Sequence, residues 1–298
     1  MDWVAPTTPR LPWENAQAPP QTAQAILPFL GAHGTAVPVP DGYWPLQTTL
    51  VPSWSAGSGT PTFTRATTAY QQDFEGKQNL VLSGEARFQG ARREYNEVVA
   101  TEALDGVSWT SATMTVTPGV TDPDGGSTAF TLTAGGANSQ LYQAISTYEA
   151  GHDWVFSIYV KRRTGSGTIQ LYQQGGFLTI PVTSSWTRVA NPVLVNGNGT
   201  THYLSVQIVT SGDAVDVWHP SANRVTGRAN QNPAEYVSAG VLSAPYHGTN
   251  VDGVKYFDTL NANTVASNVV TEATGAKIVT CASGVAATAP VDAYGPFG

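Results

Sequence analysis

The sequence predicts an all-β protein, and three observations lead to that prediction. Short runs of alternating apolar and polar residues, separated by turns rich in Gly, Asp and Asn, recur between residues 106 and 222. The 298 residues include 20 prolines and 30 glycines, which disfavour long helices. Only 12% of the residues are charged, so Thr, Ser, Asn and Gln supply much of the polar character. Strands at this spacing are typical of a β-sandwich.

Residues 1–60 predict an extended, proline-rich arm. Eleven of the 20 prolines precede residue 62, and proline opposes both helices and central strands. A short helical turn at 21–27, stopped by Pro28, is the one exception. The arm is apolar enough to need a cover, either from its own domain or, as we expect, from a neighbouring subunit. The predicted subunit contacts are Trp3, Trp13, Leu27, Phe29, Leu30 and Trp44.

The strand expected from Asp153 to Arg163 has the clearest pattern. Apolar side chains occupy every second position, as in a half-buried strand; the inward set is Trp154, Phe156, Ile158 and Val160. Gly165-Ser166-Gly167 then predicts a hairpin turn. Trp154 and Trp186 are expected in the core. Further strands are expected at 112–117, 128–133, 139–148, 168–173, 177–182, 186–195, 202–210 and 214–218.

The flanks of this region differ from it in composition. Residues 61–105 form an entry segment with a strand at Val81 and Leu82, and the mildly helical composition of Glu94 to Leu104 predicts a short helix. Residues 223–298 are a C-terminal β or irregular extension, expected to pack on the sandwich or on neighbouring subunits. The predicted organisation is therefore an arm (1–60), an entry segment (61–105), a sandwich (106–222) and this extension (223–298).

Three segments resemble parts of known proteins. Residues 63–96 resemble the entry segment of tailed-bacteriophage fibre and spike proteins; the matching residues are Phe63, Arg65, Ala66, Asp73, Gly76, Ala86, Arg87, Phe88, Gly90, Ala91, Arg92 and Asn96. Residues 107–220 resemble the jelly-roll domain of carbohydrate-binding modules and of many phage fibres, most clearly at Lys161-Arg162 and at Trp186 to Arg188. The run VDGVKYFDT, residues 251–259, resembles a junction found after the sandwich in phage fibres.

These resemblances imply a jelly-roll β-sandwich and a non-enzymatic structural protein of a tailed-phage virion, such as a fibre, spike, baseplate or capsid-decoration component. The implied partners are other virion proteins and further copies of the chain, with a trimer as the default state. Assembly would take place in the host cytoplasm. Two alternatives remain: a module that binds glycan on the host surface, and a polysaccharide depolymerase.

Composition argues against several other classes. The net charge is −7, and the only basic run is Lys161-Arg162-Arg163, which does not suit nucleic acid. No window approaches the length of a membrane span. Cys281 is the single cysteine, so no intrachain disulfide forms. None of the histidines has a metal-ligand spacing; these are His33, His152, His202, His219 and His247.

Candidate chemical sites are few, and no cofactor is predicted. A glycosidase would need paired carboxyl groups, for which the candidates are Glu94 with Glu97 and Asp252 with Asp258. Asp122 and Asp124 leave open a structural calcium ion, although a plain turn explains them as well. A sugar-stacking surface would draw on strand tyrosines that face outward, with core packing as the alternative; the candidates are Tyr142, Tyr148, Tyr159, Tyr172 and Tyr203.

Overall fold

The computed structural model describes most of the chain after residue 62. The described residues are 42–43, 54–55, 63–88, 90–145, 151–173, 176–191, 194–195, 202–242, 246–247, 249 and 251–272. They fall in two units. In the first, made of residues 1–45, 51–61 and 279–298, only the pair β1 (Gly42–Tyr43) and β2 (Trp54–Ser55) is described. The second unit contains the remaining residues. Its described residues form strands and turns. No helix among them is long and apolar enough to cross a membrane.

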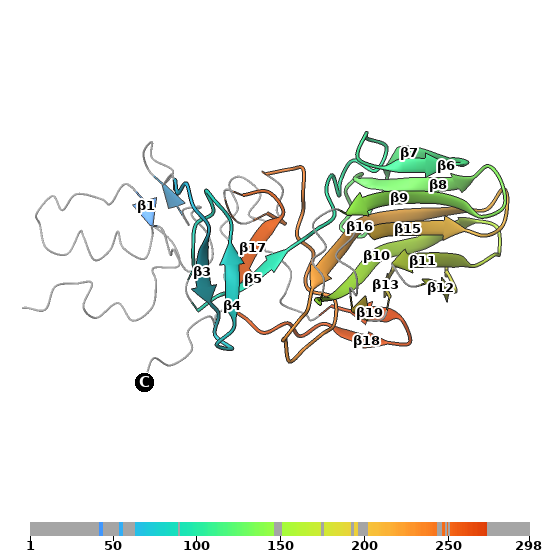
Figure 1. Ribbon diagram of the computed structural model, residues 1–298. Helices are drawn as coiled ribbons and strands as arrows, with labels where there is room; N and C mark the ends of the chain where they lie inside the picture. Colours follow the sequence, from blue (N-terminus) through green and yellow to red (C-terminus); the bar gives the residue numbers. More distant parts are fainter. Residues whose placement is uncertain are drawn as a thin grey trace, which may run out of the picture. The chain divides into compact units, whose positions relative to one another are not determined.

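Two antiparallel sheets dominate the second unit (Figure 1). The eight-stranded sheet contains β7 (Met114–Val120), β8 (Ala129–Ala134), β10 (Asp153–Thr164), β13 (Thr187–Ala190), β14 (Leu194–Val195), β16 (Ala214–Arg224), β18 (Thr264–Ala266) and β19 (Val269–Thr271). The five-stranded sheet contains β6 (Thr110–Ala112), β9 (Ser139–Ile145), β11 (Ile169–Gln173), β12 (Gly176–Ile180) and β15 (His202–Ile208).

The strand pairing is nested. With the two-residue β14 set aside, β8 pairs with β16, β10 lies between β16 and β13, β9 pairs with β15, and β11 lies between β15 and β12. The eight principal strands therefore form two sheets of four, ordered β8–β16–β10–β13 and β9–β15–β11–β12, and consecutive strands change sheet except for the hairpin β11–β12. That order is the rolled-up arrangement of a jelly roll. It confirms the predicted all-β class and the jelly-roll sandwich.

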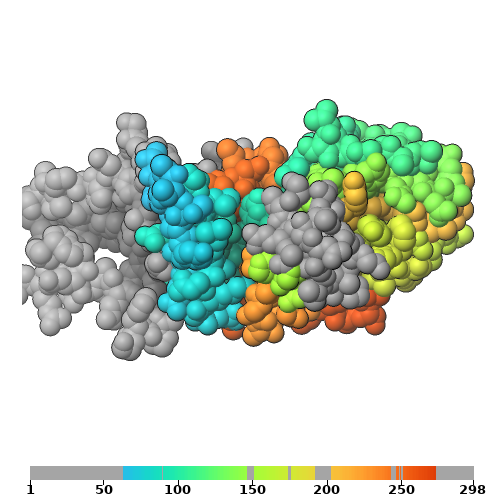
Figure 2. Space-filling view, viewed as in Figure 1, coloured from blue at the N-terminus to red at the C-terminus, as the bar shows by residue number. Residues whose placement is uncertain are grey.

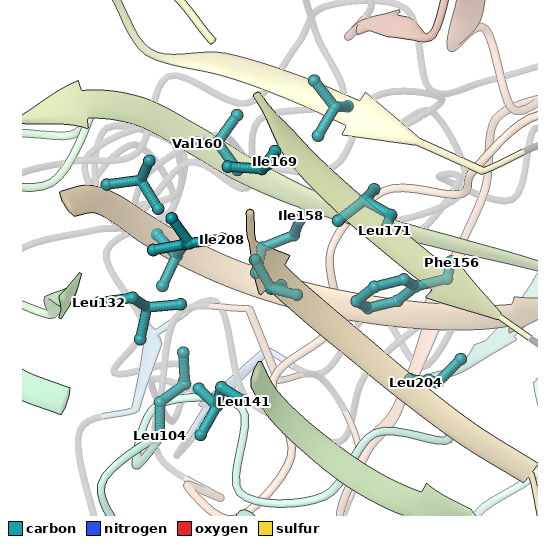
Figure 3. Close-up of a cluster of buried hydrophobic side chains, with 14 of the residues drawn as sticks. Leu104, Leu132, Leu141, Phe156, Ile158, Val160, Ile169, Leu171, Leu204 and Ile208 are labelled. Carbon is teal, nitrogen blue, oxygen red and sulfur yellow. The ribbon is translucent and has the colours of Figure 1, made fainter. Parts of the chain in front are cut away.

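The core lies between the two sheets and is built from side chains that alternate along each strand (Figure 3). Trp154, Phe156, Ile158 and Val160 all belong to it, as the sequence pattern predicted. The facing side chains come from the five-stranded sheet and include Leu141, Ile169, Leu171, Leu204 and Ile208. Burial of these apolar surfaces provides the main stabilising free energy of the sandwich.

The outer face of the eight-stranded sheet is covered by the part of the chain that follows β16. Val155 and Ala190 point away from the core and pack against Val225 and Val270 of this later segment. Trp218 packs with Tyr159, Trp186 and Tyr246 in a second cluster on the outer side. Because both faces of the sheet are covered, β16 is buried along its whole length up to Arg224, and β10 is more buried than a half-buried strand.

The turn at Gly165 to Gly167 is not the predicted hairpin. β10 pairs within the eight-stranded sheet and β11 within the five-stranded sheet, so this turn carries the chain from one sheet to the other. Asp213 holds it: the carboxylate Oδ2 accepts a hydrogen bond from the backbone N–H of Gly167 at 2.7 Å. Gly165 has a φ of +83°, and a Cβ there would lie 1.9 Å from Asp213 Oδ1, so only glycine fits.

The entry segment is also β structure, and the short helix predicted from Glu94 to Leu104 is wrong. The first two strands of this segment, β3 (Ala69–Gln72) and β4 (Gln78–Val81), pair as a hairpin. β5 (Arg92–Tyr95) pairs instead with β17 (Val254–Phe257), more than 150 residues later in the chain. Burial of alternate β5 side chains by this partner outweighs the weak local preference for helix. β7 likewise continues through Pro118, with a bulge between Thr117 and Val120.

Candidate functional site

The outer face of the five-stranded sheet carries only neutral side chains on its strands. The pairing register places twelve strand residues on this face: Thr110, Ala112, Gln140, Tyr142, Ala144, Gln170, Tyr172, Phe177, Thr179, Tyr203, Ser205 and Gln207. None of them is acidic or basic. Four are aromatic, and most of the others carry an amide or a hydroxyl group. In the space-filling view, the yellow-green residues of β11 and β12 lie at the surface (Figure 2).

The four aromatic rings form two pairs. Tyr142 and Tyr203 meet edge to face with their centroids 5.8 Å apart, and Tyr172 and Phe177 meet at a tilt at 4.9 Å. Tyr203 and Phe177 are each 48% exposed, which is unusual for rings of this size. These four residues are called the tyrosine face below. Edge contacts between the rings fix their orientations while leaving aromatic surface open to solvent.

Ser205 lies between the two ring pairs. It is the direct cross-strand partner of Tyr142 on one side and of Tyr172 on the other. Its side chain points outward, yet the residue is only 2% exposed, and its Oγ has no hydrogen-bond partner among the residues that the structure describes. A buried hydroxyl without a partner is uncommon in folded proteins. The next row across the same strands is made of the amides of Gln140, Gln170 and Gln207.

Three of the five tyrosines that the sequence offered as a sugar platform come together on this face, namely Tyr142, Tyr172 and Tyr203. Tyr159 does not join them, because β10 belongs to the other sheet and its ring packs against Trp218 at 5.2 Å. Tyr148 lies outside the described residues. Phe177 and Ser205 were not among the residues that the sequence predicted for this face. Once strand pairing is known, both lie in one row with Tyr142 and Tyr172, but residue order alone does not reveal that row.

The corresponding outer face of the eight-stranded sheet is charged and occupied. Arg188 is buried there, and its guanidinium donates to Glu272 at 2.7 Å, to Ser157 Oγ at 3.0 Å and to the carbonyl of Ala234 at 2.7 Å. Asp216 is buried as well and accepts from Arg163 at 2.6 Å. Arg188 is thus engaged by Glu272 and Ala234 of the later part of the chain, and Asp216 is paired with Lys161 and Arg163 of β10, so neither charge is free.

A second cluster of charges joins β5 to residues 228–235, and its Glu85 also accepts a hydrogen bond from the hydroxyl of Tyr256 on β17 at 2.7 Å. Arg92 on β5 donates to Glu94 at 2.5 Å and to both oxygens of Glu235 at 2.7 Å. Arg228 also donates to Glu94. On the neighbouring position of β5, Arg93 forms a two-point ion pair with Glu85, at 2.7 Å for each bond. Burial of so many paired charges fixes how β5, β17 and residues 228–235 fit together.

Burial and charge shift the pKa values in this cluster. Although burial raises the pKa of Glu94, Arg228 and Arg92 hold it below the ordinary value. Burial raises the pKa of Glu235, and the neighbouring Arg92 only partly offsets that effect. Burial also lowers the pKa of Lys255, the cross-strand partner of Glu94, to about 7, against an opposing effect of Glu235. Lys255 is therefore partly neutral near pH 7.

The carboxyl pairs considered for glycoside hydrolysis are used in other ways. Glu94 is fully buried, and its Oε1 is bound by the two guanidinium groups. Asp252 accepts two hydrogen bonds from the backbone N–H of Gly240, at 2.8 and 2.9 Å. The buried Glu94 is therefore not presented to a polymer chain, whereas Asp252 is exposed and is bound only to this backbone group.

Asp122 closes a turn. Its carboxylate accepts hydrogen bonds from the backbone N–H groups of Asp124, Gly126 and Thr128 and from the Thr128 hydroxyl. These donors direct both carboxylate oxygens into the loop, which does not fit a calcium ligand set at Asp122. Asp124 accepts instead from the hydroxyl of Tyr246. Across the described part of the chain, no three acidic, His or Cys side chains are grouped to hold a metal ion.

Other residues singled out in the sequence lie elsewhere. Trp154 is 1% exposed and Trp186 is half-buried, so the core prediction is confirmed for the first and partly for the second. His219 is buried at a bulge in β16, where its ring stacks between Trp218 and Tyr236. The predicted subunit contacts and Cys281 lie outside the described residues; the contacts are Trp3, Trp13, Leu27, Phe29, Leu30 and Trp44.

Comparison with known proteins gives similarity in structure but none in sequence. No protein-family model and no curated protein matches the chain. The enzymatically active domain of tailspike protein 4 from bacteriophage CBA120 is 19% identical with a TM-score of 0.35, over 44% of this chain and 21% of that one. A xylan-binding module of Paenibacillus barcinonensis is 15% identical with a TM-score of 0.34, over 45% and 93%.

A carbohydrate-binding module solved with β-1,4-galactotriose is 13% identical with a TM-score of 0.33, over 43% of this chain and 98% of that one. The chain thus spans about a fifth of the tailspike protein. At TM-scores below 0.5, none of these likenesses supports a functional conclusion. The assignment of the jelly-roll sandwich rests on the strand order itself.

Proposed function

We propose that this chain is a non-enzymatic component of a tailed-phage virion whose jelly-roll sandwich binds a glycan on the host surface. The observation that carries the binding role is the tyrosine face, where two pairs of aromatic rings lie open on a sheet that carries only neutral groups. Tyr142, Tyr172, Tyr203 and Phe177 are held by the rigid strands of the sandwich rather than by loops. Such preorganisation reduces the entropy lost on binding.

The chemistry of this face suits a saccharide. A sugar ring has an apolar face of C–H groups, which packs against an aromatic ring, and a rim of hydroxyl groups, which bond to amides and hydroxyls. Aromatic walls with a few well-placed polar groups are the usual composition of a small-molecule site. Here the amides of Gln140, Gln170 and Gln207 form the next row beside the rings. Weak contacts of this kind gain strength when several copies act together.

The virion role rests on the resemblance of residues 63–96 and 251–259 to phage fibres. The pairing of β5 with β17 supports it, because it joins these two segments, distant in sequence, into one unit. Two side-chain hydrogen bonds also cross between the segments, from Arg92 Nε to the carbonyl of Thr259 at 3.0 Å and from the Tyr256 hydroxyl to Glu85 at 2.7 Å. In this proposal residues 1–60 attach the chain to neighbouring virion proteins, the assembled form is a homo-oligomer with a trimer as the default, and the sandwich faces the host.

The binding role is tested with purified protein on a glycan array, followed by titration calorimetry with the strongest ligand. We expect saccharide-dependent binding that is lost in the variant carrying Tyr142→Ala and Tyr172→Ala. Tyr70→Ala is the matched control, because Tyr70 is a 66% exposed strand tyrosine away from this face. No binding to any glycan, or equal loss in the control, would contradict the proposal. A fall in viscosity of the bound polymer would instead indicate a depolymerase.

The virion role needs a separate experiment. A chain that lacks residues 1–60 should fold but fail to enter phage particles, because it has lost the segment proposed to attach it. Particle incorporation is measured by immunoblot of purified virions, with the full-length chain as the reference. Normal incorporation of the truncated chain would contradict the attachment role of the arm, without bearing on glycan binding.

A further inference from the structure

We infer that the tyrosine face selects an uncharged saccharide chain that crosses the strands, and that Ser205 Oγ is the central hydrogen-bonding group for one of its hydroxyls. This inference rests on the proposed glycan-binding function and goes beyond it by naming the ligand class and a specificity-determining residue. Charge, geometry and an unpaired buried hydroxyl lead to it independently.

The outward strand residues of the five-stranded sheet carry no charge that would attract an anionic sugar. A carboxylate, sulfate or phosphate group on a sugar must exchange water for other partners when it binds, and proteins supply Arg or Lys for that purpose. The twelve outward residues of the five strands include no Arg, Lys or His. The formal charge of the chain is −7, so the wider field also disfavours an anion. An uncharged saccharide meets neither obstacle.

The geometry sets the direction of the ligand. Phe177, Tyr172, Ser205, Tyr142 and Thr110 are successive cross-strand partners and form one straight row over β12, β11, β15, β9 and β6. Adjacent strands lie about 4.8 Å apart, so the row extends over roughly 19 Å. That length accommodates several linked sugar rings rather than a single one. The glycan chain therefore runs across the strands, with Tyr172 and Phe177 on one side of Ser205 and Tyr142 on the other.

Ser205 carries a buried hydroxyl group that the packing of the sheet does not explain. A serine in the middle of a central strand does not stabilise that strand locally, because its hydroxyl competes with the hydrogen bonds between strands for backbone groups. Here Oγ is buried and has no hydrogen-bond partner within the described part of the chain, although the side chain points to the outer face. Folding thus gains nothing visible from this hydroxyl. A saccharide hydroxyl held between Tyr142 and Tyr172 would supply the missing hydrogen bond.

The test uses the full chain and a glycan array that displays neutral oligosaccharides together with sialylated, uronic-acid and sulfated ones. We expect the bound glycans to be neutral. The strongest neutral ligand is then titrated into Ser205→Ala by calorimetry, with an expected rise in Kd of about five-fold through loss of one hydrogen bond. Because Oγ bonds to none of the described residues, the thermal midpoint of Ser205→Ala should stay within about one degree of wild type.

The matched control is Ser221→Ala in the eight-stranded sheet. Ser221 is also fully buried in a central strand, but its hydroxyl donates to Asn223 Oδ1 at 3.0 Å. This variant should lower the thermal midpoint and leave the Kd unchanged. Binding mainly to acidic glycans, or an unchanged Kd in Ser205→Ala, would overturn the inference while the glycan-binding function stands. Absence of wild-type binding to every glycan would overturn both.

Discussion

The two sheets of the sandwich share one core but have opposite outer faces. Outside the eight-stranded sheet, the buried residues Arg188 and Asp216 lie in ion pairs, and the chain after β16 supplies the partner of Arg188 and packs over Val155 and Ala190. Outside the five-stranded sheet, the strands present aromatic rings and neutral amides, two of the rings being about half exposed. A stable sandwich needs only the shared core. The difference therefore shows where this chain uses its outer surface for packing and where it leaves that surface open.

Arg188→Ala should produce the largest loss of stability, because it breaks the packing of the covered face. The variant leaves Glu272, Ser157 and the Ala234 carbonyl without their shared donor. We expect the free energy of unfolding to fall by about 4 kcal/mol. Urea denaturation measures it. Arg87→Ala, which removes an exposed arginine, should change it by less than about 0.5 kcal/mol. Equal effects of the two variants would contradict the contrast between covered and open surface.

Gly165→Ala should come next, because this turn passes the chain from the eight-stranded to the five-stranded sheet. The new Cβ would meet Asp213 Oδ1 at 1.9 Å, in addition to the strain of a φ of +83°. We expect a loss of about 3 kcal/mol. Gly119 has the same φ but nothing within 4 Å of its Cβ position, so Gly119→Ala should cost only about 1 kcal/mol. Similar losses in the two variants would show that the Asp213 contact is unimportant.

A pair of tyrosine variants should separate the two faces by function. Tyr142→Ala should weaken glycan binding about ten-fold, which corresponds to about 1.4 kcal/mol, with little effect on unfolding. Tyr159→Ala should do the reverse, because its ring packs between the covered-face residues Trp218 and Arg188. Calorimetry and urea denaturation of both proteins check the crossed pattern. If Tyr159→Ala weakened binding as much as Tyr142→Ala, the tyrosine face would not be the site.

The last prediction concerns the pH dependence of stability. Burial holds the pKa of Lys255 at about 7, whereas an unfolded lysine titrates near 10.4. Between these values the unfolded chain binds more protons than the folded chain, so stability should rise with pH in this window, by at most about 1.4 kcal/mol per pH unit. Lys255→Met should reduce that slope, as measured by denaturation at pH 7, 8 and 9. An unchanged slope would show that Lys255 is charged in the folded protein.

Local patterns in the sequence were sufficient for the strands and the core but not for the surfaces. Alternation identified the inward side chains of β10, since period-2 burial is a local property. The hairpin predicted at Gly165 was wrong because the choice between pairing and changing sheets depends on Asp213, almost fifty residues later. The helix predicted after Glu94 was wrong for the same reason, because β17 supplies the partner strand.

The candidate site was predictable only in part. Outward-facing tyrosines can be guessed from alternation, and Tyr142, Tyr172 and Tyr203 were. Their assembly into one face with Phe177 and Ser205 depends on the register between β9, β15, β11 and β12, which no single segment encodes. The exclusion of Tyr159 likewise depends on which sheet β10 joins.

A structure of the full chain with the strongest array ligand bound tests the central claim most directly. The account predicts a neutral saccharide lying across the strands of the five-stranded sheet, with sugar rings against Tyr142 and Tyr172 and one hydroxyl within hydrogen-bonding distance of Ser205 Oγ. A ligand bound on the eight-stranded sheet, or on the β3–β4 hairpin with the tyrosine face left empty, would contradict it.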